Sequence, residues 1–290
     1  MSKLCIHPFI HEPTNTISYV VADIASKQAA VIDPVLDYEL GEGKVECHFV
    51  DTIVHFLDDN NLNLEWIFET HAHADHLSGA HYLKAKRGGL IGIGEHITKV
   101  QTTFSEIFNL NGDLACDGSQ FDYLCEDGEI LNLGHLQIEV IHTPGHTPAC
   151  VSYRVEDAVF VGDAILLPDI GTARADFPNG SARAMYQSIQ RILSLPDKTR
   201  IFVGHDYQSP KRNYFAWETS VLEEKRNNID AHIGIREDEF VRLRQSQDAT
   251  LATPMLLMPA LQVNIRAGKL PTAESNGKHY LKIPLSTYAA

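Results

Sequence analysis

A cluster of side chains that bind metals stands near the end of the first quarter of the sequence. Residues 69–80 read ETHAHADHLSGA, and four candidate ligands fall within six positions, namely His71, His73, Asp75 and His76. Neutral imidazole and carboxylate groups are ligands for Zn²⁺ and Fe²⁺. Alone, Asp75 would be read as a helix N-cap and each histidine as a polar surface residue. Four such residues at this spacing favour a metal site.

Three later residues extend the cluster, each at or just beyond the end of a predicted strand. His146 lies in the turn-rich loop HTPGHTPA after the strand IEVI, Asp163 ends AVFVGD, and His205 ends IFVGHD. Functional groups of α/β folds usually gather at such strand ends. Gly145 and Gly162 leave room there for close backbone approach. The other ten histidines lack this setting and are not predicted ligands: His7, His11, His48, His55, His81, His96, His135, His142, His232 and His279.

Hydrophobic patterning predicts the elements that hold these residues. The segment 16–34 resembles a hairpin, 47–60 has the apolar spacing of an amphipathic helix, and LEWIF (64–68) is a buried strand before a helix over 75–87. Further strands are expected in 89–94, 129–145, 149–157, 158–166 and 199–207, and further helices in 96–109, 181–196, 217–229 and 236–246. Residues 111–128 are expected to be irregular, and a proline-punctuated tail ends the chain. This pattern fits two packed sheets with helices outside better than one doubly wound parallel sheet.

Composition narrows the class of protein. The 290 residues are 44% hydrophobic and 21% charged, as in ordinary globular proteins, and the formal net charge of −14 argues against nucleic acid or an anionic membrane as partner. No run of about 18 apolar residues predicts a membrane span, and the N-terminus does not resemble a secretory signal. The five cysteines form no CxxC pair, so we expect reduced thiols and a cytoplasmic protein.

The HxHxDH motif, together with His146, Asp163 and His205, resembles the metallo-β-lactamase superfamily. The resemblance covers most of the chain and implies an α/β fold. This fold is an αββα sandwich of two mixed β-sheets flanked by helices, with the metal site at one edge of the sheets. AVIDP also resembles the first motif of the superfamily, which implies a structural or ligand-orienting role for Asp33. We expect a single domain over residues 1–290, with C-terminal helices and a tail extension over about 250–290.

Further motifs resemble the persulfide dioxygenase branch of that superfamily. They are THAHADHLSGA, HTPGHTPACVSY, VGDAIL, GTARADF and GHDY, followed by EEKRNN, EDEFVRL and LQVNIRAG near the C-terminus. The chain departs from the pattern of this branch in two places. The segment 91–125 is longer than expected, which would alter substrate size, and the extension 269–290 follows the usual end of the family, which would alter assembly.

The seven ligand-type residues alone do not decide between one metal and two. In a two-zinc site, His71, His73 and His146 would hold one ion. Asp75, His76 and His205 would hold the other, and Asp163 would bridge them. The resemblance implies instead one Fe²⁺ per chain, bound by His71, His146 and Asp163.

Such a 2-His-1-carboxylate set leaves positions open for dioxygen and for the sulfur of a persulfide. The terminal sulfur would be oxidised, and water would then release it as sulfite together with the parent thiol. His73, Asp75, His76 and His205 would then orient the ligands and tune the iron.

The resemblance also suggests residues for a thiol carrier such as glutathione. Arg174 and Asp176 in GTARADF would line the pocket or form a structural salt bridge, and Tyr207 and Arg226 resemble glutathione-contacting positions. Arginine suits the two carboxylates of glutathione through bidentate hydrogen bonds. Coenzyme A persulfide and other low-molecular-weight thiol persulfides are alternatives. Cys150 is expected to be a small buried side chain rather than a reactive thiol.

The main alternative function is a two-zinc thioester hydrolase resembling glyoxalase II, although that family more often has an arginine followed by aromatic residues where this chain has GTARADF. A nuclease or lactonase of the same superfamily comes third, and the acidic net charge weighs against the nuclease. A binding protein with an inactive metal site would not need seven intact ligand-type residues. The resemblance also suggests a homodimer.

Overall fold

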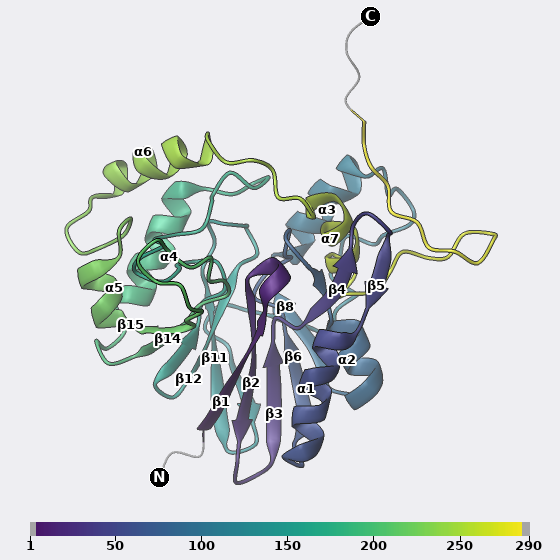
Figure 1. Ribbon diagram of the computed structural model, residues 1–290, viewed down its shortest axis with the longest axis horizontal. Coiled ribbons are helices and arrows are strands. Elements are labelled where there is room, and N and C mark those ends of the chain that lie inside the picture. The colour runs from purple at the N-terminus through teal and green to yellow at the C-terminus, as the bar shows by residue number, and fades with distance from the viewer. Residues whose placement is uncertain (1–3, 286–290) are drawn as a thin grey trace, which may run out of the picture.

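Two six-stranded sheets form the centre of the computed structural model, which describes residues 4–285 (Figure 1). The first sheet has the order β1-β2-β3-β6-β8-β9 and the second β10-β11-β12-β13-β14-β15. The first comprises β1 (Leu4–His11), β2 (Thr16–Asp23), β3 (Gln28–Ile32), β6 (Asn63–Phe68), β8 (Leu90–Gly94) and β9 (Tyr123–Cys125). The second comprises β10 (Ile130–Leu133), β11 (Leu136–His142), β12 (Val151–Val155), β13 (Ala158–Phe160), β14 (Arg200–Phe202) and β15 (Glu218–Ser220). A small sheet, β5-β4-β7, joins β4 (Val35–Glu39), β5 (Lys44–Glu46) and β7 (Leu77–Ser78).

Helices cover the outer face of each sheet, as Figure 1 shows for α1 and α2 on one side and α4 to α6 on the other. The helices are α1 (His48–Asp59), α2 (Ala80–Arg87), α3 (Ile97–Ile107), α4 (Ala182–Leu193), α5 (Val221–Asn227), α6 (Glu237–Asp248) and α7 (Leu257–Asn264). One core lies between the sheets and reaches α4, and it includes the aromatic residues Tyr19, Phe68, Tyr153, Phe160 and Phe202. A second core lies between the first sheet and α1, α2, α3 and α7. The αββα sandwich expected from the sequence is confirmed.

The amphipathic spacing expected for 47–60 is confirmed in α1, which buries Val50, Ile53 and Leu57 against the first sheet. The Asp37 carboxylate accepts a hydrogen bond from the Phe49 backbone N–H at 2.9 Å, which satisfies a donor at the start of this helix. The hairpin expected in 16–34 is also confirmed, because β2 and β3 pair antiparallel.

Several expected boundaries are wrong. The helix expected over 75–87 begins only at Ala80, because Leu77 and Ser78 pair with Leu36 and Val35 of β4. The expected strand 129–145 is two strands, β10 and β11, joined by a tight turn. Within the irregular segment 111–128, β9 pairs parallel with β8. The strand expected over 199–207 ends at Phe202, so His205 lies in the following loop.

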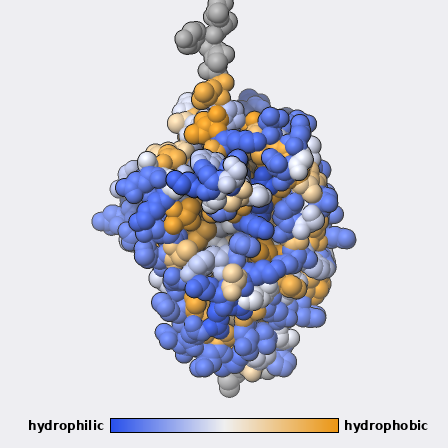
Figure 2. Space-filling model, turned by 90° about the vertical axis from the view of Figure 1, so that its right-hand side faces the viewer, coloured by the Kyte–Doolittle hydropathy of each residue, from blue (hydrophilic) through white to orange (hydrophobic). Residues whose placement is uncertain are grey.

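The C-terminal part also differs from expectation. The helix expected over 217–229 is shorter, because Glu218–Ser220 pairs with β14 before α5 begins. The proline-punctuated tail contains a helix, α7, whose side chains pack into the second core. Beyond it, residues 271–285 form neither helix nor strand, and Figure 2 shows hydrophobic surface where this segment leaves the body. None of the helices in 4–285 is long and apolar enough to cross a membrane.

Candidate metal centre

Four loops at one edge of the two sheets carry the candidate ligands. The loop between β6 and β7 carries His71, His73, Asp75 and His76, and the others follow β11, β13 and β14 with His146, Asp163 and His205. The strands β13 and β14 run parallel, so the loops after them start at the same edge of the sheet. All seven side chains are buried except Asp75, which is half-buried. The structure therefore gathers the seven residues that the sequence singled out.

Glycine makes two of these loops possible. At Gly145 a Cβ would lie 2.4 Å from the Met185 Cα, and Gly162 has a φ of +50° with a Cβ position 2.5 Å from the Thr70 hydroxyl. Any larger residue would push the His146 loop off α4 or the Asp163 loop off the loop that carries His71.

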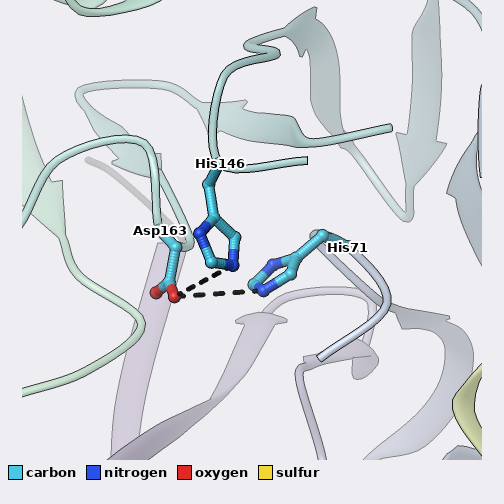
Figure 3. A group of neighbouring side chains, drawn as sticks. All are labelled: His71, His146 and Asp163. Carbon is cyan, nitrogen blue, oxygen red and sulfur yellow. Dashed lines mark ion pairs between the residues drawn. The ribbon is translucent and has the colours of Figure 1, made fainter. Parts of the chain in front are cut away.

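His71, His146 and Asp163 form the first of two ligand sets (Figure 3). Each offers one ligand atom, and these atoms lie within 4.8 Å of one another. The Asp163 Oδ2 atom lies 3.7 Å from His146 Nε2 and 4.0 Å from His71 Nε2. Figure 3 shows the three side chains converging from separate segments of the chain.

Hydrogen bonds on the far side of each ring fix which nitrogen of the first set faces the centre. His146 Nδ1 donates to the Arg174 carbonyl at 2.8 Å. His71 Nδ1 lies 3.0 Å from the Thr70 hydroxyl, which itself donates to Asp33 and so accepts from the imidazole. Both Nε2 lone pairs are then free to bind a metal. Burial, followed by the nearby His73 and His146, holds the pKa of His71 well below its ordinary value, which keeps the ring neutral.

His73, Asp75 and His205 form the second ligand set. His205 Nε2 lies 3.4 Å from Asp75 Oδ2 and 3.5 Å from Asp163 Oδ1. Asp163 therefore lies between the two sets with one oxygen toward each. This differs from the two-zinc arrangement expected from the sequence, which grouped His73 with the first set and His76 with the second. His76 belongs to neither set, and its Nδ1 lies 3.3 Å from both Asp75 and the Thr16 hydroxyl.

Asp33 holds this loop from the end of β3. Its carboxylate accepts from the Thr70 N–H at 2.7 Å, from the Thr70 hydroxyl at 2.8 Å and from His73 Nε2 at 3.0 Å. Glu69 approaches the same His73 nitrogen at 3.3 Å and contacts Ser78. Although burial lowers the pKa of His73, Asp33 raises it well above the ordinary value. Asp33 thus orients ligand residues, as expected from AVIDP.

The donor set fits a divalent metal ion. Buried atoms at the centre have no hydrogen-bond partner among the described residues, including His71 Nε2, Asp163 Oδ1 and both ring nitrogens of His205. Leaving such atoms unpaired is costly, and a metal ion would satisfy them. Imidazole with carboxylate suits zinc or iron, so the atoms define a metal site without defining the metal.

A cavity of about 1030 Å³ reaches the metal centre, and Asp75, His76, His146 and Asp163 are among the residues that line it. Two of the three residues expected at the substrate, Arg174 and Tyr207, line it. Arg174 also forms the salt bridge with Asp176 considered from the sequence, at 2.6 Å. Arg226 is exposed on α5 and is not among the lining residues, so the structure does not bring it to the site.

Cys150 is 3% exposed, and its sulfur contacts the Thr147 hydroxyl at 3.1 Å, in agreement with the expected buried side chain. Burial raises the pKa of this thiol to about 12, so the reactive thiolate is scarce near neutral pH. We expect an alkylating reagent to modify half-buried Cys116 in the native protein and to spare Cys150 until the chain unfolds. Peptide mass spectrometry after a timed reaction checks this, and early labelling of Cys150 would contradict it.

Sequence reasoning did not find the role of Asn264, which lies at the end of α7. Its side-chain amide donates to the carbonyls of His73 and His76, both at 2.8 Å, and its oxygen accepts from the Ser78 N–H at 2.7 Å. These bonds fasten the ligand loop to a helix almost 200 positions along the chain. The segment LQVNIRAG was noticed in the sequence, but nothing in it pointed to this contact.

Replacing Asn264 with alanine should leave three backbone groups buried without partners. At about 1 kcal/mol or more for each, the metal-free variant should lose roughly 3 kcal/mol of unfolding free energy and should bind metal less tightly. Urea denaturation and metal content after dialysis measure both effects. Asn276→Ala in the exposed tail is the control, and equal stability of the two variants would disprove the role of Asn264.

Comparisons with known proteins agree with this geometry. Residues 12–205 match the family model of the metallo-beta-lactamase superfamily. The chain is 46% identical to a protein of Burkholderia pseudomallei named "Probable metallo-hydrolase", covering 97% of this chain and 99% of that protein. It is 29% identical to the mitochondrial persulfide dioxygenase ETHE1 of Homo sapiens, over 90% of this chain and 89% of that protein.

A solved structure shares the architecture. The crystal structure of ETHE1 from Myxococcus xanthus superposes with a TM-score of 0.73 at 28% identity, covering 91% of this chain and all of that one. The family match spans the region that contains all seven ligand-type residues, from the first cluster to His205. The chain belongs to the metallo-β-lactamase superfamily.

Proposed function

We propose that the protein is a non-haem iron persulfide dioxygenase acting on glutathione persulfide or a related thiol persulfide. The observation that carries the proposal is the first ligand set, in which two imidazoles and one carboxylate, from His71, His146 and Asp163, offer ligand atoms within 4.8 Å of one another. His73, which the two-zinc arrangement places with the first ion, is grouped with Asp75 and His205 instead. Its Nε2 is bonded to Asp33, and its buried Nδ1 has no hydrogen-bond partner among the described residues. The likeness to the human protein named persulfide dioxygenase ETHE1, and to the solved structure of ETHE1 from Myxococcus xanthus, supports the same reaction.

In this reaction one persulfide, one dioxygen and one water give one thiol, one sulfite and two protons. A ferrous ion bound by His71, His146 and Asp163 would supply the electron transfer to dioxygen that zinc cannot provide. The protein supplies position and polarity. Thr70 and the Arg174 carbonyl orient the two imidazoles, and the cavity holds the thiol carrier beside the three ligands.

Oxygen consumption tests the proposal. Protein loaded with Fe²⁺ should take up oxygen on addition of glutathione persulfide and release one sulfite for each oxygen consumed, whereas zinc-loaded protein should not. The proposal fails if iron-loaded protein takes up no oxygen with glutathione, cysteine or coenzyme A persulfides.

A two-zinc thioester hydrolase is the second candidate, and the position of Asp163 favours it. Because its two oxygens face different ligand sets, Asp163 has the placement of a bridging ligand. The relative named as a metallo-hydrolase points the same way. Two equivalents of zinc bound per chain, with hydrolysis of a glutathione thioester and no oxygen uptake, would establish this reaction instead.

A further inference from the structure

A second group of side chains suited to catalysis lines the same cavity. Its members are His11 at the end of β1, Thr14 in the 3₁₀ turn Glu12–Thr14, and Asp37 on β4, and none belongs to either ligand set. Thr14 Oγ1 lies 2.7 Å from His11 Nδ1, and His11 Nε2 lies 3.3 Å from Asp37 Oδ1. A hydroxyl, an imidazole and a carboxylate are thus connected as a nucleophile, its base and the group that orients the base. The two ring nitrogens are exchanged relative to the triad of serine proteases, but the connectivity is the same.

Hydrogen bonds fix the direction in which a proton can move through this group. The carboxylate of Asp37 only accepts, so a neutral His11 presents Nε2–H to it and leaves its Nδ1 lone pair to the Thr14 hydroxyl. Burial lowers the pKa of His11, although Asp37 raises it, so the ring is neutral near pH 7 and can take the hydroxyl proton. The other oxygen of Asp37 accepts from the Phe49 N–H at 2.9 Å, which holds the carboxylate in place.

The surroundings of Thr14 suit the approach of an acyl group. Thr14 and Asn15 are half-buried and line the cavity, whereas His11 is only 5% exposed. The Thr16 hydroxyl lies 2.7 Å from the Thr14 hydroxyl and can donate to it, which helps to hold the Thr14 oxygen in position. Within residues 4–285 the side-chain amide of Asn15 makes no hydrogen bond. Its N–H groups are therefore free to stabilise negative charge that develops on a carbonyl oxygen.

We propose that Thr14, His11 and Asp37 form a second catalytic site, which hydrolyses small esters through an acyl group carried on Thr14. Thr14 Oγ1 attacks the carbonyl carbon of the ester while its proton passes to His11 Nδ1. Asp37 stabilises the resulting imidazolium, which gives the proton to the departing alcohol and leaves an acyl-Thr14 ester. Water then attacks that ester with His11 again as the base, and the acid leaves as the Thr14 hydroxyl is restored. This activity is separate from the proposed oxidation, because it uses none of the candidate metal ligands.

Acetylation of Thr14 by p-nitrophenyl acetate tests the proposal. Metal-loaded protein is mixed with the ester, quenched in acid after a series of short times, digested and analysed by peptide mass spectrometry. The peptide that contains Thr14 should gain one acetyl group during an initial burst of p-nitrophenol and should lose it once the ester is consumed. Hydrolysis at the metal centre would use water as the nucleophile and would leave Thr14 unmodified, so the acetyl group separates the two sites.

Substitutions assign the roles within this group. Thr14→Val should abolish the burst, whereas Thr14→Ser should keep it. His11→Gln should slow acetylation of Thr14 about 100-fold, the lower end of the range for a general base, and Asp37→Asn should slow it in the same direction. Thr250 is a control within the wild-type protein, because it also lines the cavity but donates its hydroxyl proton to the Gln247 carbonyl at 2.7 Å. Its peptide should therefore stay unmodified while Thr14 reacts.

The outcomes do not depend on the reaction at the metal centre. No acetylation of Thr14, acetylation of Thr14 no faster than that of Thr250, or an unchanged rate in folded His11→Gln would each overturn the second site. If the urea midpoint shows that His11→Gln does not fold, the comparison of Thr14 with Thr250 in the wild-type protein decides. Rapid acetylation of Thr14 in a protein that consumes no oxygen with any persulfide would support this site and refute the dioxygenase reaction.

Discussion

Asp163→Asn should abolish metal-dependent activity while leaving the fold intact. Asp163 supplies an oxygen to each ligand set and belongs to the first set with His71 and His146. Loss of an orienting residue around a metal site commonly costs 10- to 100-fold in affinity or activity, so loss of this ligand should cost more than about 100-fold. The prediction holds for the dioxygenase and for the hydrolase, because both require the metal.

Stability distinguishes this loss from misfolding. Asp163 Oδ1 is buried without a hydrogen-bond partner among residues 4–285 and lies 3.5 Å from His205 Nε2, so the loss of this ion pair offsets the removal of a buried charge from the metal-free protein. Urea denaturation of the metal-free proteins should show a midpoint close to that of the wild type, while metal analysis of the variant after dialysis shows little bound ion. Asp157→Asn on the turn between β12 and β13 is the control, and it should retain metal. Full metal content in Asp163→Asn would remove Asp163 from the ligand set.

The sequence predicted which residues meet at the metal centre, because they occupy corresponding positions after the strands of the two sheets. His71, Asp163 and His205 follow strands that end at one edge of the sandwich, and chain pattern locates these strands even where it misplaces their last residues. It did not predict how His73 and His76 divide between the two ligand sets. That depends on side-chain directions within one loop, which Asp33 and Glu69 fix through contacts with His73.

Long-range contacts explain the remaining misses. Asn264 reaches the ligand loop from a helix that periodicity did not reveal in the tail. His11 belongs to neither ligand set, as expected, but it is buried and lines the cavity, with Nδ1 2.7 Å from Thr14 and Nε2 3.3 Å from Asp37. Arg226 was expected at the substrate but does not line the cavity. The position of an arginine on a short helix does not tell which face of the helix turns outward. Contacts between distant segments decide where these side chains lie, and the local sequence pattern does not reveal such contacts.

Asp33→Asn should cost the metal-free protein about 3 kcal/mol of unfolding free energy, because removing one partner of a buried ion pair strands the other. Asp33 is 1% exposed and accepts hydrogen bonds from both Thr70 donors and from His73. Urea denaturation of this variant, of His73→Gln and of the double variant forms a cycle. The double variant should lose less than the sum of the single losses. Additive losses would mean that the two side chains do not interact.

The same pair should make stability depend on pH in a defined direction. Burial raises the pKa of Asp33, but His73 and the Thr70 hydrogen bonds lower it below the ordinary value of 3.8. Its contribution is therefore present above pH 3.8 and is lost as the pH falls through the folded-state pKa. For His73, burial lowers the pKa and Asp33 raises it well above 6.5, so its contribution is complete below pH 6.5 and is lost as the pH rises through the folded-state pKa.

The stability difference between wild type and Asp33→Asn should thus be greatest between pH 3.8 and pH 6.5 and should narrow on the alkaline side. Urea titrations of the metal-free proteins at a series of pH values measure this difference directly. A difference that stays constant from the acidic to the alkaline end would show that the pair is not ionised in the folded protein. Asp33 would then act on the ligand loop through neutral hydrogen bonds alone, and His73 would be neutral and available to a metal in the second ligand set.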